Sequence, residues 1–189
     1  MKKLFYIAIF CFFVVSISVS ILYTGFAHAE QIRENSFMKW REWISSHQDY
    51  LDSIESLMKK DNEIEMQQAV DLQDAINKKD KALGDNILTQ NTKRLSAIVA
   101  TLKALTPPKE FKDYHDKITT VYQLKQMANE ATLKKNLFNI KDCSNKAITA
   151  EIEAMESIKK LYISHGAPSQ IIDSINRGIA SYSQRLATN

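Results

Sequence analysis

The sequence predicts an all-α protein: an up-down antiparallel bundle of four principal helices plus a short C-terminal helix, preceded by a hydrophobic N-terminal segment. Three observations lead to this prediction. After Asn35, apolar residues recur at steps of three and four, the period of an amphipathic helix. The chain has only four glycines and three prolines, and no alternating run of apolar and polar residues indicates a strand. Short connections between helices favour antiparallel neighbours.

Residues 1–29 have the features of a secretory signal peptide. Lys2 and Lys3 precede an uncharged stretch from Leu4 to Tyr23, and the triplet 27–29 has the small-x-small pattern of a cleavage site. The uncharged stretch is also long enough to span a bilayer, so an uncleaved membrane anchor is the alternative. Both interpretations predict export to a periplasmic or extracellular location.

Residues 30–189 are expected to form one helical-bundle domain. Without Lys2 and Lys3 the chain has 23 basic and 22 acidic residues, so no strong field would attract nucleic acid. Membrane contact is expected only through residues 4–23 if they stay uncleaved. After cleavage Cys143 would be the only cysteine, which excludes an intramolecular disulfide.

The first helical pattern starts at Phe37 and reaches Met58, and the polar segment 59–63 is expected to form the first corner. The pattern then resumes, with Met66 and Val70 on the apolar stripe, and continues to Leu105. The polar, glycine-containing segment 78–86 predicts a kink or a short loop. Whether residues 64–105 form one helix or two stays open at this point.

Later breaks in the pattern are expected at three places. Pro107 and Pro108 stop one helix, because proline lacks a backbone donor and restricts the residue before it. The helical phase slips across residues 133–145. Gly166 suits the left-handed position after a helix, and Pro168 suits the first turn of a last helix over 171–186.

The segment LTPPKEFKDYH (105–115) is the main candidate for a functional position. We interpret it as a structural corner in which Pro108 starts the next helix and Phe111 and Tyr114 open its buried face. His115 lies one step off that face, where its ring is expected to pack and still reach water. It is the one functional candidate that the corner offers.

The same residues carry a resemblance. The pattern L-x-x-L-x-P-P-x-x-[FY]-x-x-x-H over residues 102–115 resembles a segment of exported bacterial helical-bundle proteins and lipoproteins of uncharacterised function. The resemblance covers about a tenth of the chain and implies location and fold, with no activity to transfer.

The sequence lacks most of the motifs that are typical of enzymes, cofactor sites and metal sites. No catalytic, cofactor-binding or metal-binding residue is therefore predicted. No glutamate stands three residues before His47, His115 or His165, which argues against the Glu-x-x-His pattern of paired-iron bundles. Non-covalent haem held by a methionine and a histidine stays open. Glu151, Glu153 and Glu156 are interpreted as a solvated helix face.

Two functions from different classes follow. The first is an exported non-enzymatic bundle that contacts a protein partner or the cell envelope. The alternative is a bundle that binds a small ligand, metal or haem. No cofactor is predicted under the first.

Overall fold

The structure is a computed structural model that describes residues 34–188, and all its regular elements are helical. The all-α prediction is therefore confirmed over this range. The elements are α3 (Glu34–Ser46), α4 (Gln48–Asn77), α5 (Lys81–Ala104), the short 3-10 helix η1 (Lys109–Phe111), α6 (Lys112–Leu133), α7 (Leu137–Ser164) and α8 (Ser169–Thr188).

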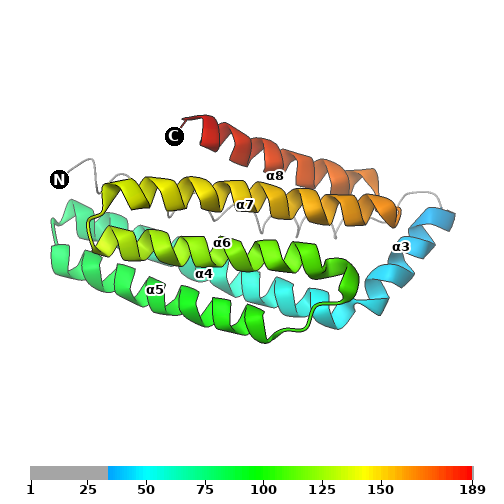
Figure 1. Ribbon diagram of the computed structural model, residues 1–189, viewed down its shortest axis with the longest axis horizontal. Helices are drawn as coiled ribbons and strands as arrows, with labels where there is room; N and C mark the ends of the chain where they lie inside the picture. The colour runs from blue at the N-terminus through cyan, green and yellow to red at the C-terminus, as the bar shows by residue number, and fades with distance from the viewer. Residues whose placement is uncertain (1–33, 189) are drawn as a thin grey trace.

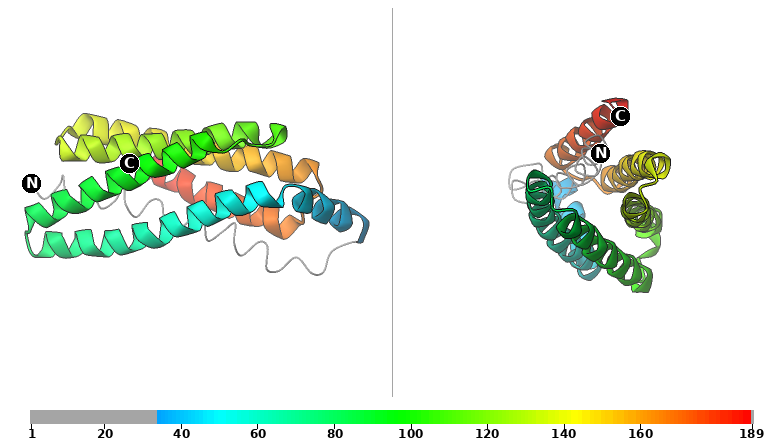
Figure 2. Two further views of the ribbon diagram at one scale, coloured as in Figure 1. Left: turned by 90° about the horizontal axis from the view of Figure 1, so that it is seen from below. Right: turned by 90° about the vertical axis from the view of Figure 1, so that its left-hand side faces the viewer.

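Consecutive helices pack antiparallel, so α4 to α7 run up and down beside one another (Figure 1). Helix α8 lies along α7 (Figure 1). Helix α3 projects at an angle from the N-terminal end of α4 (Figures 1 and 2). The C-terminal helix has 20 residues and is longer than the short helix that the sequence predicts.

The bundle has two different ends because of this topology. The α4–α5 and α6–α7 turns lie together at one end, which we call the lysine end (residues 77–86 and 133–142). The α3–α4 junction, the Pro107–Pro108 corner and the α7–α8 turn lie at the other, which we call the proline end (residues 43–52, 105–114 and 159–168).

The two turns of the lysine end have the same backbone conformation and hydrogen-bonding pattern. Lys79 and Lys135 adopt left-handed backbone angles, with φ of 55° and 56°. The next residue, Asp80 or Asn136, donates its N–H to a carbonyl five residues earlier and caps the following helix with its side chain. Each turn therefore closes one helix and opens the next within three residues.

Two expectations about helix boundaries are resolved here. Residues 64–105 form two helices, since the break at 78–80 falls within the polar segment expected to interrupt them. The expected corner at 59–63 is wrong: α4 continues through it, and the chain bends at His47 instead. A run of charged residues does not stop a helix when those residues form hydrogen bonds inside the fold, as Asp61 does here.

The apolar stripe predicted on α4 is correct before residue 59 and wrong after it. Ile54 and Met58 of α4 are buried in the main hydrophobic core, together with Trp40 of α3. Met66 and Val70 are 56% and 64% exposed, while Asp61 and Glu65 face inward. The interior of the bundle is therefore polar at mid-length, and the apolar periodicity of this stretch points outward.

The predicted signal peptide or anchor (residues 1–29), including the cleavage site, lies outside the described residues. Within residues 34–188 no helix is both long and apolar enough to cross a membrane. Cys143 is a free, buried cysteine, and burial raises the pKa of its thiol.

Candidate functional site

The chain passes from α5 to η1 and α6 through Pro107 and Pro108. Leu105 is extended, Pro108 has extended backbone angles and caps η1, and α6 follows immediately. Pro108 thus precedes the first helical residue by one position. Phe111 is fully enclosed, and the buried Tyr114 hydroxyl points at the sulfur of Met58.

His115 is more deeply buried than expected. Its side chain is 5% exposed, so the expectation that it reaches water is wrong. Its Nε2 lies 3.0 Å from the Leu102 carbonyl, which only accepts, so Nε2 carries the proton. Its Nδ1 lies 3.2 Å from the Tyr50 hydroxyl. Both ring nitrogens are occupied, and the ring joins α4, α5 and α6.

Glu110 is the polar centre of the proline end. One carboxylate oxygen contacts His47 Nε2 at 2.5 Å and accepts a hydrogen bond from Trp43 Nε1 at 3.0 Å. The other oxygen lies 3.5 Å from His165 Nε2. A single carboxylate therefore holds the α3–α4 junction and the end of α7 against the corner.

The two histidines occupy matching positions at helix ends. His47 Nδ1 lies 2.8 Å from the Trp43 carbonyl, and His165 Nδ1 lies 2.9 Å from the Leu161 carbonyl. Each Nδ1 also lies near a serine hydroxyl: Ser46 Oγ is 3.0 Å from His47 Nδ1, and Ser164 Oγ is 3.1 Å from His165 Nδ1. Each imidazole therefore joins the end of its helix to Glu110. The signal in the sequence was the Ser-His pair that ends both helices.

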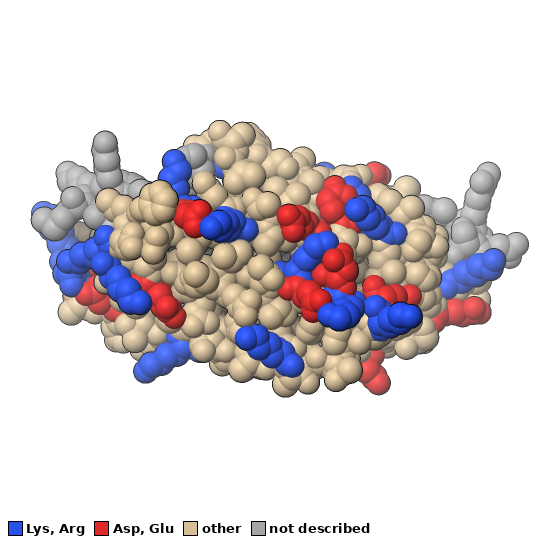
Figure 3. Space-filling view, viewed as in Figure 1, with Lys and Arg blue, Asp and Glu red and all other residues tan. Residues whose placement is uncertain are grey.

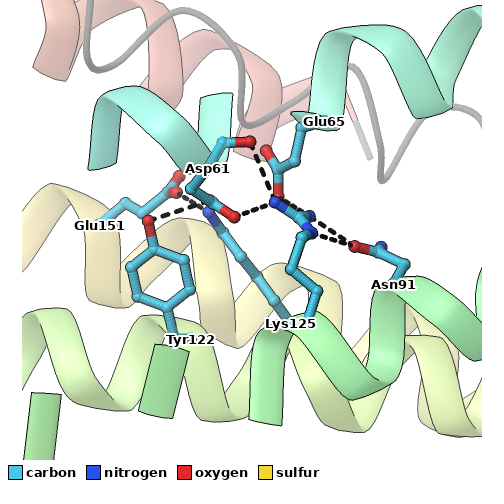
Figure 4. Close-up of polar contacts among 7 residues, drawn as sticks. Asp61, Glu65, Asn91, Tyr122, Lys125 and Glu151 are labelled. Atoms are coloured by element: carbon cyan, nitrogen blue, oxygen red, sulfur yellow. Dashed lines mark hydrogen bonds and ion pairs between the residues drawn. The ribbon is translucent and has the colours of Figure 1, made fainter. Parts of the chain in front are cut away.

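A second polar cluster lies inside the bundle, which we call the interior cluster (Figure 4). It unites side chains from α4, α5, α6 and α7: Asp61, Glu65, Asn91, Arg94, Tyr122, Lys125 and Glu151.

The Arg94 guanidinium is the hub of the interior cluster. It pairs with the Asp61 carboxylate, donates to the Asp61 backbone carbonyl at 3.0 Å and reaches Glu65 Oε1 at 3.3 Å. The Tyr122 hydroxyl donates to the other oxygen of Asp61 at 3.0 Å. Lys125 pairs with Glu151 at 3.3 Å. The three carboxylates of these pairs are nearly inaccessible, and the side chains of Arg94 and Lys125 are only slightly exposed.

The interior cluster has more carboxylates than cations. Within the cluster three carboxylates (Asp61, Glu65, Glu151) face two cations (Arg94, Lys125), and Glu65 Oε2 has no hydrogen-bond partner among the described residues. Burial raises the pKa of Glu65 to about 7, and neighbouring Asp61 acts in the same direction. Uptake of a proton by Glu65 would remove one of the three negative charges.

Glu151 corrects the sequence interpretation of residues 151–156. It was expected on a solvated face, yet it is buried, and burial raises its pKa although Lys125 opposes the shift. Tyr182 and Arg185 of α8 also favour its ionised form. Sequence reasoning missed it because a buried glutamate and an exposed one have the same helical spacing, and only the partner on another helix distinguishes them.

The lysine end is the third polar region and the one most open to solvent. Phe138 is 81% exposed and Leu137 is 48% exposed, both in the first turn of α7. Lys134, Lys135 and Lys141 flank them and are exposed as well. Figure 3 shows basic side chains at this end, on the left of the view.

Comparison with known proteins adds no further assignment. No protein-family model matches the chain, and no curated protein or solved structure is similar to it. Among residues 34–188, no three histidine, cysteine or acidic side chains are grouped so that they could hold a metal ion.

Proposed function

We propose that this protein is an exported, non-enzymatic bundle of four principal helices plus a C-terminal helix, and that it acts by contact with the cell envelope. The observation that carries the proposal is the exposed pair Leu137 and Phe138 at the lysine end. Large apolar side chains that protrude together from a folded domain mark contact surfaces. The resemblance of residues 102–115 to exported bundle proteins supports the same location.

The buried polar groups support a structural use of the interior. His115 links α4, α5 and α6, Arg94 links α4 and α5, and Glu110 links the corner to the α3–α4 junction and the end of α7. These side chains use their hydrogen-bonding groups within the fold, so the surface is the part of the molecule that can meet a partner.

Export is tested by the N-terminus of the protein recovered from an expressing bacterium. We expect the chain to begin at Glu30 after cleavage, or to keep residues 1–29 as an anchor in the membrane fraction. Recovery of the protein in the cytoplasm, with Met1 retained, would contradict export.

Envelope contact is tested by a photo-crosslinking amino acid introduced in cells in place of Phe138. The matched control replaces Ile163, which is 55% exposed at the proline end. We expect position 138 to crosslink to an envelope component and position 163 to give no such product. Equal products at both positions, or none at 138, would refute contact through the lysine end.

A second candidate function is the binding of a small organic cation by the interior cluster. The unpartnered Oε2 of Glu65 supports it, since buried carboxylates otherwise keep hydrogen-bond partners. Putrescine is a suitable probe. This function predicts that putrescine raises the midpoint temperature of the wild type and has no effect on the Glu65→Gln variant.

A further inference from the structure

We infer that the lysine end docks on an anionic lipid surface, with Phe138 and Leu137 inserting between the lipids and lysines contacting the phosphates. The inference rests on the proposed envelope contact and names its partner. It is separate from the membrane contact that is expected through residues 4–23 if they stay uncleaved. Four observations about the lysine end support it.

The first observation is charge. The two segments of the lysine end contain six lysines and three aspartates, a surplus of three positive charges. The three segments of the proline end contain four lysines and four acidic residues, which cancel. The positive surplus of the chain is thus concentrated at one end of the bundle, where it would attract an anionic lipid surface.

The second observation concerns which lysines are available. Lys78 and Lys81 pair with Asp74 and Asp85 on their own helices. Four others form no ion pair with any residue in the described range: Lys79, Lys134, Lys135 and Lys141. Their ammonium groups are exposed and can meet phosphate oxygens.

The third observation is backbone conformation. At the α7–α8 turn the left-handed position is filled by Gly166, with φ of 77°, as is usual after a helix. At both turns of the lysine end the same position is filled by lysine. A side chain there is disfavoured by contact between its Cβ and the backbone. The presence of a lysine at both turns is explained if its positive charge binds an anionic surface.

The fourth observation is the apolar pair itself, which selects lipid over other anionic polymers. A soluble or wall-bound polyanion would be bound by lysines alone. Exposed Phe138 and Leu137 between Lys135 and Lys141 combine apolar and basic groups, the composition of surfaces that lie in the lipid interface. Leu83, on the neighbouring turn, is also exposed and extends the apolar area.

The test uses the full chain as the exporting cell produces it, with a local probe. Phe138→Trp places an indole at the tip, and Ile163→Trp places one at the proline end; the native Trp40 and Trp43 contribute equally to both proteins. Phosphatidylglycerol vesicles with brominated chains are added, because bromine quenches an indole only at short range. We expect quenching for Phe138→Trp alone, none with neutral phosphatidylcholine vesicles, and loss of quenching in ~1 M salt, where screening is strong.

The contribution of charge is tested in the Phe138→Trp background. Replacing Lys134 and Lys135 by glutamine should weaken vesicle binding about tenfold or more, because each lysine near an anionic surface contributes to binding. Replacing Lys159 and Lys160 by glutamine makes the same charge change at the other end and should have little effect.

Three results would overturn the inference: no quenching by the anionic vesicles, equal quenching at the two positions, or equal quenching by neutral vesicles. These results are separable from failure of the proposed function. If position 138 crosslinks in cells to a protein or glycan while the vesicles do not quench, envelope contact stands and lipid docking fails. If position 138 gives no crosslink in cells, both fail.

Discussion

Replacing Glu65 by glutamine should make the stability of the protein less dependent on pH. Glu65 is 4% exposed, lies beside Asp61 and shares Arg94 with it. Glutamine has the same size and keeps an oxygen that can accept from Arg94. It removes only the charge and the ability to titrate.

The magnitude follows from the pKa of Glu65, which burial raises from 4.5 to about 7 in the folded protein. A folded-state pKa above the unfolded value means that the folded state binds the proton more tightly. The resulting stability is fully present below pH 4.5 and is lost as the pH rises through 7. Between pH 5 and pH 8, Glu65 should therefore remove about 2–3 kcal/mol from the free energy of unfolding.

Urea denaturation followed by circular dichroism at pH 5 and pH 8 measures this difference. We expect the wild type to lose more stability between these pH values than Glu65→Gln does, by about 2–3 kcal/mol. Comparing the two proteins cancels the contributions of other titrating groups. Glu63, two residues earlier on the same helix, is exposed, so Glu63→Gln should keep the pH dependence of the wild type.

An unchanged pH dependence in Glu65→Gln would refute the reasoning. It would mean that Glu65 stays ionised in the fold, and that Arg94 and Lys125 compensate for its burial. The same result would be expected for Glu151, because burial is also the cause that raises the pKa of its carboxyl group.

Four further substitutions test the packing around the corner and the two ends of the bundle. Phe111→Ala should lower the free energy of unfolding by about 3–5 kcal/mol because the ring is fully enclosed. His115→Gln should lower it by about 1–3 kcal/mol because the change disturbs two buried hydrogen bonds. Urea titration measures both losses, and equally small losses would contradict the described packing. Glu110→Gln should cost about 1–2 kcal/mol, since it removes the charge that faces two imidazole rings, and a neutral result would show that these contacts do not form in solution. Lys135→Gly should raise the urea midpoint, with a gain of up to about 1 kcal/mol from relief of the left-handed strain, and a decrease would contradict the assigned backbone conformation.

Much of the fold could be predicted from local patterns. The break at 78–80, the Pro107–Pro108 corner and the left-handed Gly166 depend on backbone chemistry that each residue carries with it. The corner expected at 59–63 was wrong because the sequence shows charge and does not show the partner of that charge. Asp61 remains helical because Arg94 and Tyr122 satisfy its carboxylate.

The candidate sites were harder to predict for the same reason. Glu110 and His165 are 55 positions apart in the sequence and meet only when α7 returns to the corner. The interior cluster draws side chains from four helices, none of which has a distinctive local motif. His115 was recognised as a candidate, but its burial depends on Tyr50 and Leu102, which other helices supply.

The sequence by itself determined that this chain is helical and where most of its helices end, because period, proline and glycine act within a few residues. Only the tertiary structure decided which charges lie inside and which apolar residues lie outside. Met66 and Glu65 are neighbours on one helix, and their spacing alone favours burying the methionine. The opposite arrangement forms because Arg94 and Lys125 project from other helices to meet the carboxylate, and a paired buried charge is tolerated where an unpaired one is not.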